Sequence, residues 1–163
     1  METGLPAFFR SETMFSGEPI DYQNEVLTND GFWPDLNLAD FQQRRNIPSD
    51  IDAGTLSAAL VATVAEINLD LAKLATQLKG QGYQVAAAVP GPNIDGKTAL
   101  IAQYEKAVFA RAKADLLGEY STQFSRTPNA GQENPETRSR LLAEAAFVLR
   151  NMKGVRRSSA RLV

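Results

Sequence analysis

The side chains that most often perform catalysis are missing from this sequence. Its 163 residues include neither cysteine nor histidine, so no thiolate, disulfide or imidazole can act as nucleophile, general base or metal ligand. Carboxylates remain, and Glu66 and Asp70 would lie one helical turn apart. However, acidic residues at this spacing are also common on helix faces that simply contact water. We therefore expect a protein that is not an enzyme, with no catalytic residue, metal or cofactor.

A glycine-lysine-threonine triplet is the second candidate for chemistry. Gly96, Lys97 and Thr98 are similar to the end of a phosphate-binding P-loop, and Gly91 stands where that loop has its first glycine. However, prolines flank Gly91 on both sides, and a P-loop follows a strand of a parallel sheet, which this sequence does not predict. We interpret the triplet as the cap of a helix.

Length and composition indicate one domain with tails. Hydrophobic residues make up 44% of the 163 positions, enough for one sizeable core but not for two. No run of about 18 apolar residues could span a bilayer, and residues 1–10 lack the pattern of a signal peptide. Since cysteine is also absent, we expect a protein made and kept in a reducing, cytoplasm-like compartment.

Charge is distributed unequally between the two ends, although the net charge is only −2. Residues 1–52 hold ten acidic and three basic side chains, whereas residues 138–163 hold one acidic and seven basic side chains. Opposite potentials orient partners and accelerate their encounter. This polarity is typical of a head-to-tail assembly or of a chain with two unlike partners, and solvated faces of no special role are the alternative.

The elements that must position these residues fall into three regions. Residues 1–30 show no helical period and predict an extended arm, residues 31–154 predict a helical domain, and residues 155–163 predict a basic tail. At the start of the domain, Phe32 and Trp33 precede a proline, which keeps Trp33 out of the α conformation. The two aromatic side chains either anchor the core or form a rigid amphipathic corner.

The fold class expected from hydrophobic periodicity is all-α. We expect a small bundle of two long antiparallel helices, a third C-terminal helix and a short N-terminal helix. Asn37 is the expected N-cap of the short helix, Asn134 with Pro135 opens the third, and Gly154 ends it. The four predicted helices cover residues 36–45, 53–79, about 95–124 and 135–152.

Several short landmarks together resemble one protein family. They are an aromatic-aromatic-Pro-Asp motif, a long alanine-rich helix, an Ile-Asp-Gly helix start, the stretch 104–108 and an arginine-rich end. In this order they resemble the phage head completion protein, gene product L, of temperate contractile-tailed phages of the peduovirus type, over residues 26–153. The motif residues are Phe32, Trp33, Pro34, Asp35, Ile94, Asp95 and Gly96.

This resemblance implies a structural virion protein, a head-tail connector or adaptor. Its subunits would form a ring of about twelve copies under the portal vertex, help to retain packaged DNA and offer an attachment surface to tail or neck completion proteins. Double-stranded DNA would pass through the lumen without sequence-specific binding, and no membrane would be involved. The expected location is the head-tail junction of the virion, and the host cytoplasm during assembly.

Two hypotheses assign roles to the ends of the chain, where the resemblance is weakest. The basic tail would order against the portal protein, through Arg156, Arg157, Arg161, Leu162 and Val163. The arm would insert large aromatic side chains into a groove on the adjacent ring subunit, namely Phe8, Phe9 and Phe15.

The alternative function is a small helical DNA-binding or packaging-accessory protein that uses the arginine-rich helix and tail. Counterion release at phosphates would supply its affinity. The acidic overall balance, with seventeen basic against nineteen acidic residues, disfavours it. Retention on duplex DNA that falls steeply with ionic strength would distinguish it from an adaptor.

Overall fold

The computed structural model describes residues 21–123 and 135–155. This part of the chain is mostly helical, but it also contains two small antiparallel sheets of two strands each, which corrects the all-α expectation. The elements follow in the order β1 (Val26–Leu27), β2 (Leu36–Asn37), α1 (Leu38–Arg45), α2 (Ala53–Asp70), α3 (Ala72–Gly80), the 3-10 helix η1 (Ala86–Ala88), β3 (Asn93–Ile94), β4 (Lys97–Thr98), α4 (Ala99–Gln123) and α5 (Pro135–Met152).

Local capping signals explain where α1 and α5 begin and end. The Asn37 side chain accepts the Ala39 N–H at 2.7 Å and opens α1, and Asn46 ends it in the left-handed conformation with φ of 50°. α5 begins at Pro135, and Gly154 follows its end with φ of 67°. The helix predicted over residues 135–152 is confirmed. The helix predicted over residues 36–45 is also present but begins two residues later, at Leu38, because Leu36 and Asn37 pair with β1.

The predicted long helix over residues 53–79 is wrong in one respect. It is broken at Leu71 into α2 and α3, which are bent by 59° relative to each other. Leu71 is fully buried, and the apolar spacing continues unchanged from one helix to the other. A periodic pattern therefore cannot reveal this bend, which belongs to the packing of the whole domain.

The Ile-Asp-Gly segment is also not the helix start that we predicted. Asp95 and Gly96, with φ of 50° and 81°, form the two-residue turn of a hairpin between β3 and β4. α4 begins only after it, and the Thr98 hydroxyl accepts the Ile101 N–H at 3.4 Å. The capping interpretation of the Gly-Lys-Thr triplet is therefore confirmed at Thr98, and the helix begins four residues later than expected.

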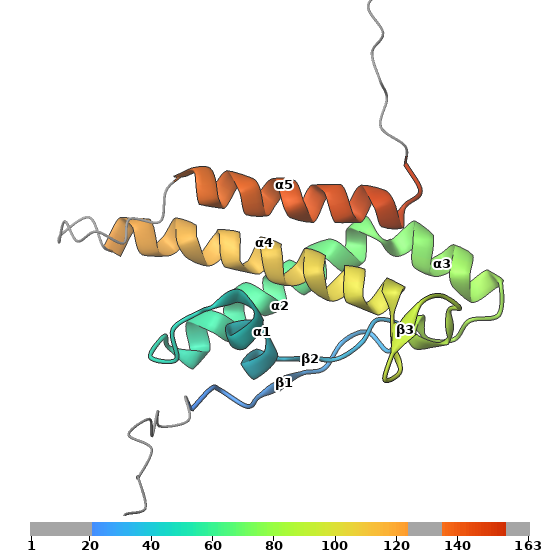
Figure 1. Cartoon of the computed structure of the whole chain (residues 1–163), viewed down its shortest axis with the longest axis horizontal. Coiled ribbons are helices and arrows are strands. Elements are labelled where there is room, and N and C mark those ends of the chain that lie inside the picture. Colours follow the sequence, from blue (N-terminus) through green and yellow to red (C-terminus); the bar gives the residue numbers. More distant parts are fainter. Residues whose placement is uncertain (1–20, 124–134, 156–163) are drawn as a thin grey trace, which may run out of the picture.

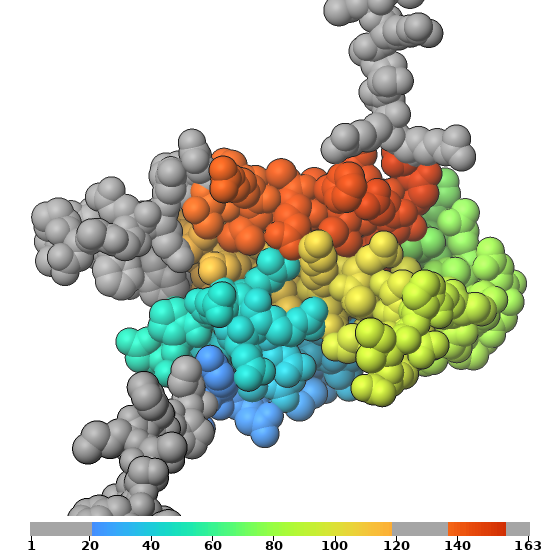
Figure 2. Space-filling model, viewed as in Figure 1, coloured from blue at the N-terminus to red at the C-terminus, as the bar shows by residue number. Residues whose placement is uncertain are grey.

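α4 is the central helix of the domain. It packs against α2 and α5, and Figure 1 shows α4 and α5 side by side and running in opposite directions. Among residues 99–118, Lys106 alone is exposed. In the view of Figure 2, α5 forms the upper edge of the molecule above α4.

The N-terminal residues of the described part lie against this helical body. Residues 26–27 pair with residues 36–37 in an antiparallel sheet, and the Gln23 backbone N–H donates to the Gln42 side chain at 3.0 Å. Residues 1–20, which make up most of the predicted arm, lie outside the described residues.

The segment between α3 and β3 contacts the aromatic motif at the start of the domain. η1 buries Ala86 completely, and the Ala86 backbone N–H donates to the Phe32 carbonyl at 2.9 Å. This contact links the connector after α3 to the aromatic motif before α1. In the described part of the chain, no single helix is long and apolar enough to cross a membrane, although α2 and α3 pass that test of length and composition as a bent pair.

Candidate interaction surfaces

The aromatic-aromatic-Pro-Asp motif is held in a tight turn by its own side chains. The Asp30 Oδ1 atom accepts the backbone N–H groups of both Phe32 and Trp33 at 3.0 Å. The Asn29 N–H donates to the Asp35 carboxylate at 2.8 Å. Because these acceptors precede and follow the aromatic pair, local side chains satisfy the backbone N–H groups of the turn and favour its conformation.

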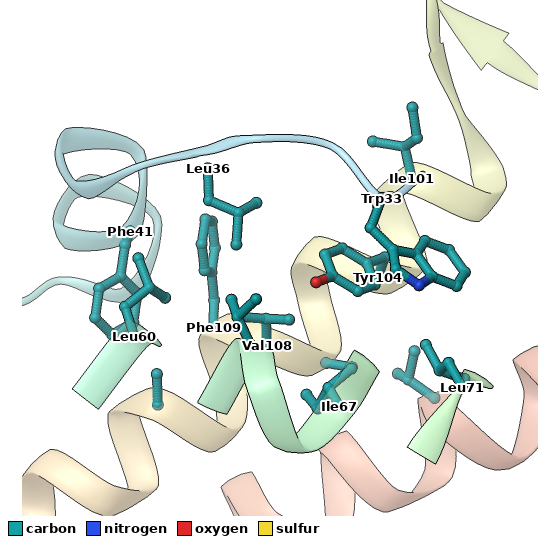
Figure 3. Packing of buried hydrophobic residues seen from close by; sticks show 14 of the residues in the cluster. Trp33, Leu36, Phe41, Leu60, Ile67, Leu71, Ile101, Tyr104, Val108 and Phe109 are labelled. Carbon is teal, nitrogen blue, oxygen red and sulfur yellow. The ribbon is translucent and has the colours of Figure 1, made fainter. Parts of the chain in front are cut away.

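The turn presents Trp33 to α4. The Trp33 and Tyr104 rings stack with centroids 4.7 Å apart and planes within 4°, and Phe32 meets Trp33 edge-on at 5.0 Å. Figure 3 shows Trp33 and Tyr104 side by side among the core side chains. Both aromatic residues of the motif are 2% exposed. The motif is therefore a core anchor and not an amphipathic corner for a partner.

Three polar side chains from distant segments close a hydrogen-bonded triangle beside this stack. The Tyr104 hydroxyl donates to Asn68 Oδ1 at 2.7 Å and accepts from Asn29 Nδ2 at 2.9 Å. Asn68 Nδ2 in turn donates to Asn29 Oδ1 at 2.8 Å. Burial raises the pKa of Tyr104 well above its usual range; the hydrogen bond from Asn29 opposes this rise, and the negative charge of Asp30 adds to it.

A second polar cluster centres on Glu105, the residue next to Tyr104. Its carboxylate is almost buried and accepts from Arg44 of α1 and, at 2.8 Å, from Lys97 of β4. The neighbouring Arg45 pairs with Glu144 of α5 at 2.9 Å. These ion pairs join α1, β4, α4 and α5. The charged side chains in this region therefore stabilise the packing of these elements against one another.

The two candidate carboxylates of α2 also have cationic partners. Glu66 pairs with Arg111 of α4, and Asp70 lies 3.6 Å from the Lys153 ammonium group after α5. Near these pairs, an open depression is lined by Asp70, Arg111, Lys153 and α5 side chains. Within the described ranges, no three acidic side chains gather to hold a metal ion. The two carboxylates therefore connect α2 to α4 and to the residue that follows α5.

The P-loop interpretation of residues 91–98 is excluded by geometry. These residues form an antiparallel hairpin before α4, where a P-loop would follow a strand of a parallel sheet. The Lys97 ammonium group pairs with Glu105 and does not point into an anion-binding loop. What the hairpin does expose is Ile94, with 79% of its surface open to solvent.

Hydrophobic side chains on the outer face of α2 are a feature that we did not predict. Val61 and Leu69 are 55% and 80% exposed, and alanines of the same face are exposed beside them. The signal was present in the sequence, because α2 carries apolar residues outside its buried stripe as well as within it. On α5, Phe147 is 50% exposed.

The structure tests the remaining predicted site residues only in part. Pro34 is half-buried and Asp35 is exposed, while Asp95 and Gly96 form the hairpin turn. Outside the described residues lie the candidate arm aromatics and portal-binding residues, namely Phe8, Phe9, Phe15, Arg156, Arg157, Arg161, Leu162 and Val163. Their roles stay predictions.

These features define a small, mostly helical protein with structural polar clusters and an exposed apolar helix face. The chain belongs to the phage head completion protein (GPL) family, whose model matches residues 27–163. It is 37% identical over 150 residues to the "probable head completion/stabilization protein" of Haemophilus phage HP1, which covers 92% of this chain and all of that protein.

A second relative confirms the family. The head completion/stabilization protein of Escherichia phage P2 is 30% identical over 95 residues, which is 58% of this chain and 56% of that protein. No solved structure matches the chain. The family expected from the sequence landmarks is therefore shown, and with it a structural role in the phage head.

Proposed function

We propose that this chain is a head-tail connector subunit that completes the DNA-filled head. Its copies form a ring of about twelve subunits under the portal vertex. The ring helps to retain the packaged DNA, which passes through its lumen without sequence-specific contacts, and presents a surface to tail or neck completion proteins. The protein assembles in the host cytoplasm and stays in the virion at the head-tail junction.

The observation that carries this proposal is the match along the entire length of the HP1 protein, whose name states head completion and stabilization. The charge distribution supports it as well. Residues 1–52 are predominantly acidic and residues 138–163 predominantly basic, and such polarity favours head-to-tail contacts between identical subunits.

The principal experiment adds the purified chain to filled heads produced by a phage that lacks it. We expect restored protection of the packaged DNA from nuclease and restored joining of tails, measured as infectious particles. Electron microscopy of the chain mixed with the portal protein should show portals with an additional ring at one end. Heads that retain DNA and join tails equally well without the chain would contradict the proposal.

Two variants test the proposed roles of the ends. A chain that stops at Gly154 lacks the basic tail and should lose most of its binding to the portal in a pull-down. Undiminished binding would remove the portal-binding role of Arg156, Arg157 and Arg161. Crosslinking of the arm in assembled rings should connect Phe8, Phe9 or Phe15 to an adjacent subunit, and an arm that crosslinks only within its own chain would exclude the arm hypothesis.

One observation keeps the DNA-binding alternative in view. α5 exposes Arg138, Arg140 and Arg150, which belong to the predominantly basic residues 138–163. A DNA-binding protein should show retention on duplex that falls steeply between low and physiological salt, because each phosphate contact releases counterions. Association with the portal together with weak retention on duplex at all salt concentrations would favour the connector.

A further inference from the structure

The outer face of α2 is an apolar surface on an otherwise well-packed domain. The inner face of this helix buries Leu56, Leu60 and Ile67 in the core. The opposite face repeats at helical spacing and contains no charged side chain. Its exposed members are Ala58, Val61, Ala62, Ala65 and Leu69. We call these five residues the α2 outer face.

A comparison with α4 shows why this exposure is unusual. α4 carries five charged side chains between residues 105 and 115 and is nevertheless covered on almost all sides. α2 carries no charged residue from 53 to 65, yet half of its circumference faces solvent. A helix that is apolar on all sides is normally buried on all sides. α2 is therefore less polar than α4 and yet more exposed to solvent. The α2 outer face lacks a packing partner within the described residues.

The shape of this face suits another helix. Val61 and Leu69 are separated by eight residues, which is about 12 Å along the helix axis. Between them, the exposed Ala62 and Ala65 have small side chains, so a second helix can approach the α2 backbone closely. The adjacent Glu66 pairs with Arg111 within the same chain, so its carboxylate already has a cationic partner beside this face.

We propose that the α2 outer face binds the outer face of α5 in a second copy of this chain. The inference deepens the proposed ring and rests on it, because a ring requires two different patches on each subunit. Among the described residues, the exposed large hydrophobic side chains that lie on helices are Val61 and Leu69 of α2 and Phe147 of α5. α5 therefore offers the matching apolar patch, with Ala143 and Ala146 exposed beside Phe147.

Charge complementarity favours this pairing over contact between two α2 faces. Asp50 and Asp52 are exposed at the N-terminal end of α2, whereas the exposed face of α5 carries Arg140 and Arg150. An α2-to-α5 contact brings opposite charges together. A contact between two α2 faces would bring Asp50 and Asp52 close to the same residues of the other copy if the helices were parallel, and close to its Asp70 if they were antiparallel. The contact is thus heterologous and repeats from subunit to subunit.

The first test measures self-association of the full chain by sedimentation velocity over a range of concentrations. Leu69→Glu and Val61→Glu place a charge in the contact and should weaken self-association by about tenfold or more. The matched control is Ile94→Glu on the hairpin, because Ile94 is 79% exposed and Leu69 is 80% exposed. The control should associate as the wild type does. Equal association of Leu69→Glu and wild type would overturn the inference.

The second test uses the absence of cysteine from the natural sequence. Cells that assemble heads co-express two single-cysteine variants, Leu69→Cys and Phe147→Cys, and the purified heads are treated with a short bismaleimide crosslinker. We expect a dimer of the two variants, and no dimer when Leu69→Cys is the only variant present. A dimer of Leu69→Cys alone, or a crosslink from Leu69→Cys to the portal protein, would overturn the inference.

The two tests separate this interface from the proposed function. Heads that contain the chain but yield no crosslink between the two variants contradict the α2-to-α5 contact and leave the connector role intact. Heads that exclude even the wild-type chain contradict the connector role itself. Circular dichroism of each variant checks that the helices are formed, which is expected because all substituted side chains are at least half exposed.

Discussion

Replacement of Tyr104 by phenylalanine isolates the contribution of one buried hydroxyl group. The ring stays in place on Trp33, so the stacking at 4.7 Å is preserved. Two hydrogen bonds are lost, one to Asn68 at 2.7 Å and one from Asn29 at 2.9 Å. Asn29 keeps its hydrogen bond to the Pro34 carbonyl at 2.9 Å, whereas Asn68 Oδ1 loses its donor.

The expected loss of unfolding free energy follows from these contacts. Each net hydrogen bond contributes about 1 kcal/mol, and an unsatisfied acceptor adds to the loss when water cannot reach it. Asn68 is partly exposed, so we expect about 2 kcal/mol in total. With a urea dependence of about 2 kcal/mol per molar for a domain of this size, the unfolding midpoint should fall by about 1 M.

The assay is urea unfolding followed by far-ultraviolet circular dichroism. Tyr83→Phe is the matched control, because it removes the same atom from a half-exposed tyrosine outside the triangle. It should change the unfolding free energy by less than about 0.5 kcal/mol. If Tyr104→Phe lost no more than the control, the triangle would contribute nothing measurable and the reasoning would be refuted.

The pH dependence of the unfolding free energy, compared between the wild type and Tyr104→Phe, gives an independent test. The folded state raises the pKa of Tyr104 above its ordinary value of 10.0, chiefly by burial, so folding favours the neutral phenol. This stabilisation is complete below pH 10 and is lost as pH rises above it, because the unfolded chain releases the proton first. The wild type should therefore lose more stability above pH 10 than Tyr104→Phe does.

Two further predictions concern other contacts of the domain. Gly96→Ala should destabilise by about 1 kcal/mol, because Gly96 has φ of 81° with free space around it, so backbone strain is the sole effect. Gly80→Ala, also with free space but without a positive φ, should be neutral or slightly stabilising in the same urea assay. Glu105→Gln should reduce the unfolding free energy by about 1–2 kcal/mol, because two cations lose an almost buried carboxylate. Glu66→Gln, at an ion pair with a 55% exposed carboxylate, should change it by less than about 0.5 kcal/mol, and equal effects of the two substitutions would contradict this ranking.

How much of the fold could be predicted depended on how far along the chain each sequence signal acts. The N-cap at Asn37 and the start of α5 at Pro135 were predicted correctly, since such signals act within three or four residues. The β3–β4 hairpin had a local signal as well, because Asp95 and Gly96 are a typical two-residue turn, but the helical pattern after it was extended too far. The bend at Leu71 had no signal, because both helices share one apolar spacing.

The candidate surfaces show the same division. The importance of residues 32–35 was visible in the sequence, but the choice between core anchor and exposed corner was not. It was decided by Tyr104, whose ring stacks on Trp33 from 71 positions further along the chain. The α2 outer face had a signal in the sequence, because Val61 and Leu69 lie outside the apolar stripe, but only the surrounding helices decide which side of α2 stays uncovered.

The sequence by itself determined the family, through short landmarks in a fixed order, and it ruled out thiolate and imidazole chemistry by composition. It also predicted the N-cap of α1 and the end of α5, since caps act between near neighbours. Only the tertiary structure decided which apolar side chains are covered and that Asn29, Asn68 and Tyr104 meet. Burial is a sum of contacts between distant segments, and no local pattern of residues contains that information.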